Sequence, residues 1–204
     1  VTDGAASHPG SRRYPPEALR DLREQEARTA MRHLGLPPGR LRFLRFPDGD
    51  APLQGCGFET AVDAICAIHA EAGSGAVLAT WRCDPHRDHQ AVARMAAVAA
   101  GRLGVPHHAY PVWGWTLPPE CALDLDGVSG WRVRIADRLD AKRAAIAAHR
   151  SQTTDLIADA TTPWHLPADM RAVFDRPYEV LIAQPRDAGR PSVHLSSALP
   201  LARP

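Results

Sequence analysis

The sequence predicts an α/β fold, a Rossmann-like three-layer sandwich with a mostly parallel sheet and helices on both faces. Short strand patterns alternate with longer helical patterns, which favours right-handed βαβ units. Residues 76–81 form a short apolar run, which is typical of a buried parallel strand. The chain has 204 residues, 45% of them hydrophobic, and no internal repeat, so a single domain is expected.

The first quarter of the chain contains one clear helix between two strand signals. Residues 1–4 resemble the end of a strand, because a β-branched pair precedes an Asp-Gly turn. Residues 5–16 are rich in Gly, Ser, Pro and Arg and predict a loop. Helix formers dominate residues 17–34, and Gly35 supplies a stop. Apolar residues alternate with Arg over residues 41–46, which predicts a half-buried strand.

The remaining chain continues the alternation. Residues 57–72 place their apolar side chains on one helical face, and an Ala-rich helix is expected at residues 88–103. Further strands are expected at residues 76–81, 107–113, 131–135 and 178–183, and a further helix at residues 136–149. Residues 1–184 are therefore expected to form the domain. Residues 185–204, rich in Pro, Arg and Ser, are expected to be a flexible tail.

Charge and cysteine usage narrow the class of protein. Lys and Arg number 24 against 23 Asp and Glu, so the net charge is close to zero. The chain therefore has no strong positive electrostatic field that would attract nucleic acid or an anionic membrane. No apolar run approaches the ~20 residues of a membrane span. The four cysteines fit neither a CxxC knuckle nor a compact disulfide framework, which predicts reduced thiols. We therefore expect a cytoplasmic protein with a small-molecule substrate, no nucleic-acid partner and no membrane span.

The strongest chemical signal follows the strand at residues 76–81. Ligands of open α/β sheets bind at the carboxyl ends of strands, which selects the loops after Gly4, Phe46 and Trp81. The third loop places two His and two Asp within six residues. Histidine and carboxylate are preferred zinc ligands, and catalytic zinc uses about three protein ligands plus an open position.

Within this loop, His86 and His89 can point into one pocket while Asp88 accepts a ring N–H. This arrangement gives a metal ligand, an acid-base or electrostatic group, and an orienting carboxylate. The alternative interpretation is that Asp84 and Asp88 are turn and N-cap residues of the next helix. In that case the histidines are ordinary polar loop residues.

The helix at residues 17–34 contains a second candidate. Glu26 lies on its apolar stripe, where a carboxylate is costly unless it is paired, and Arg23 can be its partner at i−3. The functional alternative is an arginine directed at substrate or at a developing oxyanion. Asp48 is interpreted as a turn residue, and His149 as a residue that interacts with the helix C-terminus.

The ordered set of these residues resembles the PIG-L/LmbE-like zinc-dependent N-deacetylases, over residues 1–183. The matching segments are Thr2-Asp3-Gly4, Ser7-His8-Pro9, Arg23-x-x-Glu26, His86-Arg87-Asp88-His89, Lys142 with Ala145, His149-Arg150-Ser151-Gln152 and Tyr178-Glu179. The fourth segment corresponds to the family's HPDH motif, with Arg87 in place of proline.

The resemblance implies a Zn²⁺ site in which His89 is one ligand. His86 would polarise the substrate or stabilise the tetrahedral intermediate, with Asp88 behind it, and Arg23 would bind substrate. The implied reaction removes the N-acetyl group of an N-acetylglucosamine-type sugar or glycoconjugate, releasing acetate. Zinc makes this attack feasible at neutral pH, because it lowers the pKa of bound water and polarises the carbonyl.

The sequence departs from the family pattern at its beginning. The family's other two ligands and general base come from an HPDD-type loop after a first strand, and no such motif occurs in the 204 residues. The first residue is Val, so we expect that the first strand and its metal loop lie upstream. The alternative is a non-catalytic, sugar-binding remnant. The sequence does not specify the sugar or aglycone, and a homo-oligomer is compatible with it.

Overall fold

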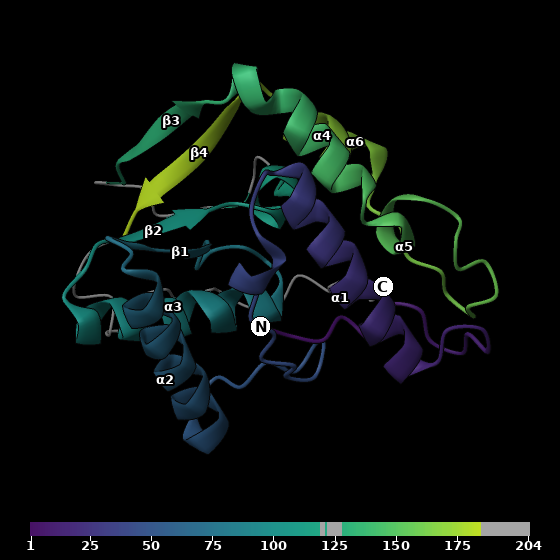
Figure 1. Cartoon of the computed structure of the whole chain (residues 1–204), viewed down its shortest axis with the longest axis horizontal. Helices are drawn as coiled ribbons and strands as arrows, with labels where there is room; N and C mark the ends of the chain where they lie inside the picture. The colour runs from purple at the N-terminus through teal and green to yellow at the C-terminus, as the bar shows by residue number, and fades with distance from the viewer. Residues whose placement is uncertain (119–120, 122–127, 185–204) are drawn as a thin grey trace.

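The computed structural model describes the chain except residues 119–120, 122–127 and 185–204. The helices are α1 (Pro16–His33), α2 (Gly55–Ala72), α3 (Arg87–Leu103), α4 (Leu139–Ala147), α5 (Arg150–Thr153) and α6 (Ala168–Phe174). The strands are β1 (Val77–Thr80), β2 (His107–Tyr110), β3 (Gly130–Arg134) and β4 (Tyr178–Ala183), and short 3-10 turns lie at Pro38–Arg40, Trp113–Thr116 and Ala136–Arg138. The α/β class is confirmed (Figure 1), whereas the predicted tail lies outside the described residues.

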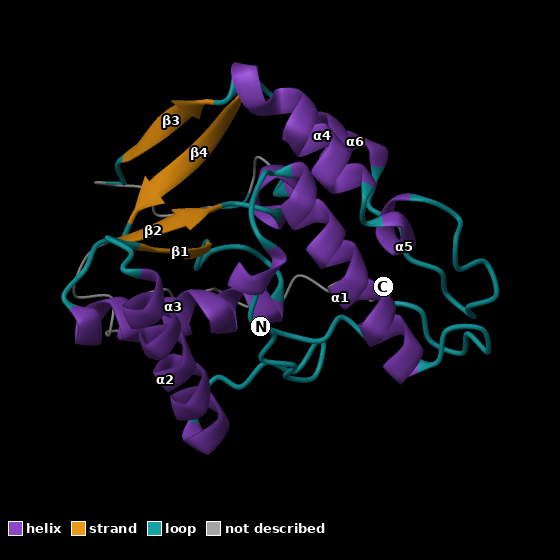
Figure 2. Ribbon diagram, viewed as in Figure 1, coloured by secondary structure: helices purple, strands orange, loops and turns teal. Residues whose placement is uncertain are grey.

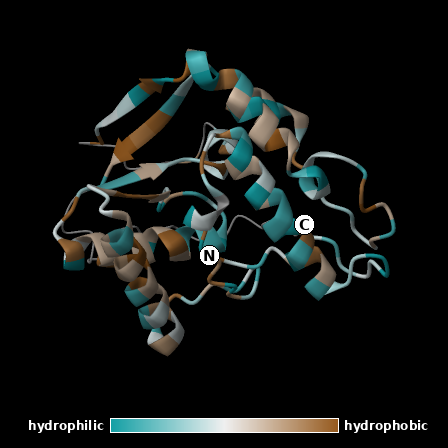
Figure 3. Ribbon diagram, in the orientation of Figure 1, coloured by the Kyte–Doolittle hydropathy of each residue, from teal (hydrophilic) through white to brown (hydrophobic). Residues whose placement is uncertain are grey.

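The sheet has the order β1-β2-β4-β3 and is mixed (Figure 2). Only β1 and β2 pair in parallel, through the β1-α3-β2 crossover, while β4 is antiparallel to both β2 and β3. The prediction of a mostly parallel sheet is therefore wrong. The alternation of side chains identifies a strand without fixing its direction, which depends on the path of the connecting helices. Figure 3 shows the apolar residues of β4, which is flanked by strands on both sides.

Helix α3 packs against one face of the sheet, and α2 packs against α3. Val77 and Ala79 of β1 pack against Ala96 and Ala100 of α3, and these small side chains allow the helix to lie close to the strand. Phe58 and other apolar residues of α2 pack on the neighbouring side of α3. The Ala-rich pattern of α3 is thus a packing requirement of the crossover.

The opposite face of the sheet is less covered. Leu78, Trp131 and Val133 are about half exposed there, while α1 packs beside α4 (Figure 1). The three-layer arrangement therefore stays a prediction. Within the described residues, no helix is both long and apolar enough to cross a membrane.

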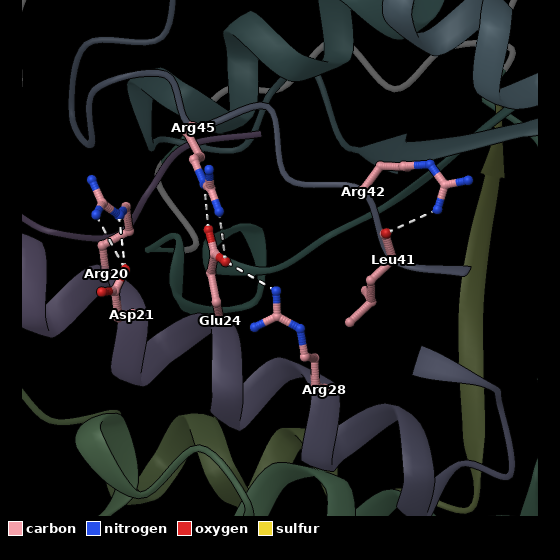
Figure 4. Close-up of polar contacts among 7 residues, drawn as sticks. All are labelled: Arg20, Asp21, Glu24, Arg28, Leu41, Arg42 and Arg45. Carbon is pink, nitrogen blue, oxygen red and sulfur yellow. Dashed lines mark hydrogen bonds and ion pairs between the residues drawn. The ribbon is translucent and has the colours of Figure 1, made fainter. Parts of the chain in front are cut away.

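Residues 41–46 are not a strand, contrary to the prediction. Phe46 forms a single parallel bridge with Thr2, but Arg45 has a φ of 56°, in the left-handed region that an extended strand cannot contain. The Arg45 guanidinium instead binds the buried Glu24 carboxylate of α1 at 2.6 and 3.0 Å, and Arg28 adds a contact at 3.1 Å (Figure 4). The hydrogen bond from Arg45 is the main reason that the pKa of Glu24 is lowered. This segment is therefore held by charge pairing and not by a strand ladder.

Candidate active site

The three loops selected from the sequence meet at one edge of the fold. Asp3 Oδ1 accepts the backbone N–H groups of Ala5 and Asp48 at 3.1 and 3.2 Å. Asp48 Oδ2 accepts the N–H of Ala6 at 3.1 Å. Asp48, interpreted as a turn residue, therefore also joins its loop to the loop after Gly4.

Asp88 connects the third loop to the second. Its carboxylate is nearly fully buried and accepts the N–H groups of Gly49 at 2.8 Å and Ala51 at 3.0 Å. The expectation that Asp88 accepts a ring N–H of His86 is not met, because its carboxylate is directed at the neighbouring loop. Its own N–H donates to His86 Nδ1 at 3.2 Å. Asp88 therefore positions the loop after Phe46.

His86 is the N-cap residue of α3, so the alternative interpretation that places an aspartate at the N-cap is wrong. Since Nδ1 accepts the Asp88 N–H, the neutral ring carries its hydrogen on Nε2. Burial lowers the pKa of His86, and the neighbouring His89 lowers it further. The imidazole is therefore a neutral donor at the start of a helix.

In His89 the role of Nδ1 is reversed, because here it donates a hydrogen bond. Its Nδ1 lies 2.9 Å from Oδ1 of the fully buried Asp84, and because a carboxylate only accepts, Nδ1 must be the donor. Asp84 Oδ2 also accepts the N–H groups of Val112 and Gly114 at 2.8 and 3.1 Å. Burial alone would raise the pKa of Asp84, but the bonds from His89 and Val112 outweigh it, and the pKa is lowered. In its neutral form His89 therefore carries its hydrogen on Nδ1 and presents Nε2 as a lone pair.

The two imidazoles lie side by side, with ring centroids 4.8 Å apart and planes inclined by 35°. His86 offers an N–H and His89 offers a lone pair. This pair can donate to a carbonyl oxygen and, through the second ring, bind a metal ion or accept a proton.

A zinc ion fits only part of this site. A carboxylate that accepts the second ring N–H is the usual support of a metal-binding histidine, and Asp84 provides it for His89. However, the part of the chain that the structure describes contains no group of three or more His, Cys, Asp or Glu that could hold a metal ion. The described residues therefore supply one candidate ligand and do not complete a zinc centre.

Arg23 lies at the base of the loop after Gly4. Its two terminal nitrogens donate to the Gly4 carbonyl at 2.5 Å and to Ser7 Oγ at 2.7 Å. Ser7 Oγ lies 2.8 Å from His8 Nδ1, which continues the chain of polar contacts. Burial lowers the pKa of Arg23, and nearby carboxylates led by Asp48 oppose this shift.

Glu26 does not form the hydrogen-bonded pair with Arg23 that its spacing predicts. Its carboxylate is buried and accepts the backbone N–H and the hydroxyl of Ser151, both at 2.7 Å. It therefore joins α1 to α5. Sequence reasoning missed Ser151 and the role of Asp84. Both lie inside motifs already singled out, next to His149 and His86, and that adjacency was the available signal.

Gly4 provides a test of the Arg23 contact. It has a φ of +70°, and a Cβ there would lie 2.6 Å from Arg23 Nη1. We expect Gly4→Ala to lower the free energy of unfolding by about 2–3 kcal/mol, because strain adds to displacement of a buried guanidinium. Denaturant unfolding measures this loss. Gly35→Ala is the control, because Gly35 has a φ of +73° with no atom within 4 Å. Equal losses in both variants would contradict the role of the Arg23 contact.

Comparison with known proteins supports a family. Residues 1–100 match the family model described as PIG-L, GlcNAc-PI de-N-acetylase. The fold is similar to the zinc-inhibited form of teicoplanin deacetylase Orf2, with a TM-score of 0.54 and 17% identity over 90% of this chain and 84% of that chain. It is also similar to the A40926 pseudoaglycone deacetylase Dbv21, with a TM-score of 0.54 and 21% identity over 90% and 81% of the two chains. No curated protein matches the sequence.

Proposed function

Because residues 1–100 belong to the PIG-L family, we propose that this chain removes an N-acetyl group from an N-acetylglucosamine-type sugar or glycoconjugate. The description of the family model supports hydrolysis of an acetamide on a sugar. The two similar structures are those of deacetylases, which agrees with this class. A cytoplasmic location and a homo-oligomer stay predictions.

The observation that carries the proposal is the pair of imidazoles with opposite tautomers. His86 accepts a backbone N–H on Nδ1, and His89 donates its Nδ1 hydrogen to Asp84. In this arrangement His86 Nε2–H donates to the carbonyl oxygen of the substrate amide. As that oxygen becomes negative in the tetrahedral intermediate, the hydrogen bond strengthens, and this difference lowers the barrier.

Arg23 is proposed to bind substrate from helix α1, beneath the loop after Gly4. It is partly buried, and its terminal nitrogens are held by Gly4 and Ser7, so its direction is fixed before substrate arrives. A charged donor with little conformational freedom contributes orientation at low entropic cost. Asp88 acts at a distance by holding the loop of Gly49 and Ala51 against the start of α3.

We propose that His89 Nε2 is one ligand of a zinc ion. When bound, zinc would lower the pKa of a water molecule and polarise the amide carbonyl. The remaining ligands must come from outside the described residues, because these contain no set of three. The Asp84 carboxylate would keep the His89 ring oriented and its Nε2 available.

Strand β1 lies at the edge of the described sheet, where a further strand can pair with it. β1 ends the described sheet, Leu78 in it is 53% exposed, and the parallel bridge between Thr2 and Phe46 lies outside this sheet. Unpaired strand edges bind a further strand readily. We propose that a further strand pairs with β1 and that the loop after this strand supplies the other ligands.

Acetate release tests the proposed reaction. We expect the purified protein to release acetate from N-acetylglucosamine conjugates, to lose this activity with a chelator, and to regain it with Zn²⁺. His33→Ala, at an exposed position at the end of α1, is the control and should keep full activity. Binding of the sugar without any acetate would contradict the hydrolase and leave the non-catalytic remnant.

A further inference from the structure

Two half-buried tryptophans have no role in the chemistry above, and one of them, Trp113, is linked to His89 through the Asp84 carboxylate. Trp113 and Trp164 meet edge to face, with ring centroids 6.2 Å apart and planes inclined by 69°. Neither belongs to the described clusters of the hydrophobic core. Trp113 begins the 3-10 turn Trp113–Thr116 and Trp164 lies in a loop, although a large aromatic side chain is usually placed to bury its surface.

Trp113 is fixed by the same carboxylate that orients His89. The N–H groups of Val112 and Gly114, on either side of it in sequence, both donate to Asp84 Oδ2. A Cβ at Gly114 would lie 3.0 Å from the ring of Trp81, so this segment is held close to the end of β1. The Trp113 backbone therefore has a fixed position relative to His89.

Trp164 is fixed from the other side of the site. The N–H of Thr161 donates to the Pro9 carbonyl at 2.9 Å, and the N–H of Leu166 donates to the Gln152 carbonyl at 2.8 Å. The loop between them is thus tied both to the N-terminal loop and to α5. Burial lowers the pKa of His8, and the backbone of Trp164 opposes this shift.

Polar groups adjoin this aromatic pair. His165, the neighbour of Trp164, lies 6.4 Å from His8, centroid to centroid, and His8 is tied through Ser7 to Arg23. An apolar wall with a few fixed polar groups is the usual composition of a small-molecule site. A pyranose ring has the complementary chemistry, because its C–H faces are apolar and its hydroxyl rim is polar.

We propose that Trp113 and Trp164 form the aromatic wall of a substrate subsite beside His89, which packs against the C–H face of the acetamido sugar ring. This inference rests on the proposed function and deepens it, since it assigns recognition of the sugar ring. The competing interpretation is that the two indoles only pack the turn at Trp113–Thr116 against α6, with which that turn is in contact. In that case their removal would change stability and leave sugar affinity unchanged.

The test measures binding without turnover. The methyl glycoside of N-acetylglucosamine is titrated against the protein with a chelator present, which prevents hydrolysis, while tryptophan fluorescence is recorded, and acetamide is the probe that lacks the ring. We expect Trp113→Ala and Trp164→Ala each to raise the dissociation constant of the glycoside by about tenfold. Trp113→Phe and Trp164→Phe, which keep an aromatic ring, should bind with a smaller loss and a reduced fluorescence change.

Trp131→Ala is the matched control, because Trp131 is 53% exposed on β3, where it contacts His108 and not the site. It should leave the dissociation constant unchanged. The proposal is overturned if both Ala variants fold and bind the glycoside as wild type does, or if wild type binds acetamide as tightly as the glycoside. Because no acetate is measured, failure of hydrolysis and failure of this subsite are separate results.

Discussion

Replacing Asp84 with alanine is expected to lower the free energy of unfolding by about 4 kcal/mol, because several buried donors lose their acceptor together. The Asp84 carboxylate is fully buried and accepts hydrogen bonds from His89, Val112 and Gly114. Alanine would leave these N–H groups without a partner, and the His89 ring would lose its fixed tautomer. Urea unfolding of the wild type and the variant measures the difference.

Two controls separate this effect from ordinary loss of charge. Asp137→Ala removes an exposed carboxylate that pairs with Arg134, and should change stability by less than about 1 kcal/mol. The pKa of Asp84 is lowered in the folded state, so its ionic contribution is present above the ordinary pKa of about 3.9 and is lost as pH falls further. The stability gap between wild type and Asp84→Asn should therefore narrow below that pH. A gap that widened on acidification would contradict the ionised pair.

Replacing His89 and His86 with alanine should have different effects. We expect His89→Ala to lower zinc affinity by at least about 100-fold, a larger loss than removal of a supporting group causes. His86→Ala should retain zinc and lower the rate of acetate release by about 10²–10³-fold, as expected for loss of an oxyanion donor. Metal analysis after dialysis and single-turnover acetate measurements provide the two readouts.

His33→Ala again serves as the histidine control, since its side chain is exposed and distant in sequence from the motif. Full metal content in His89→Ala would refute its assignment as a ligand. An unchanged rate in His86→Ala would remove the oxyanion role and leave the His89 assignment intact.

Much of the fold was predictable because local signals were strong. α1 and α3 lie where helix formers and Gly stops placed them, and β4 has the predicted bounds. The direction of β3 and β4 was not predictable, since strand alternation is the same in both directions. The strand prediction for residues 41–46 was wrong for a different reason. The ion pair between Arg45 and Glu24 joins segments distant in sequence, and no local pattern reveals such a contact.

The loops that form the site could be predicted from the sequence, but the side-chain contacts within it could not. The rule of strand carboxyl ends selected the loops that carry Asp3, Asp48 and His86, and the structure brings these loops together. Which carboxylate serves which imidazole depends on the path of the loop before α3. Asp84 reaches His89 across five positions, whereas Asp88 turns toward Ala51. Neither contact follows from spacing alone.

The most direct measurement of the central claim is the tautomeric state of the two imidazoles, read from long-range ¹H–¹⁵N NMR spectra. We predict that His89 carries its hydrogen on Nδ1 and His86 on Nε2, and that added Zn²⁺ shifts the His89 Nε2 resonance. Identical tautomers in the two rings, or a His89 Nε2 resonance that Zn²⁺ leaves unchanged, would contradict the claim that the two imidazoles have opposite roles.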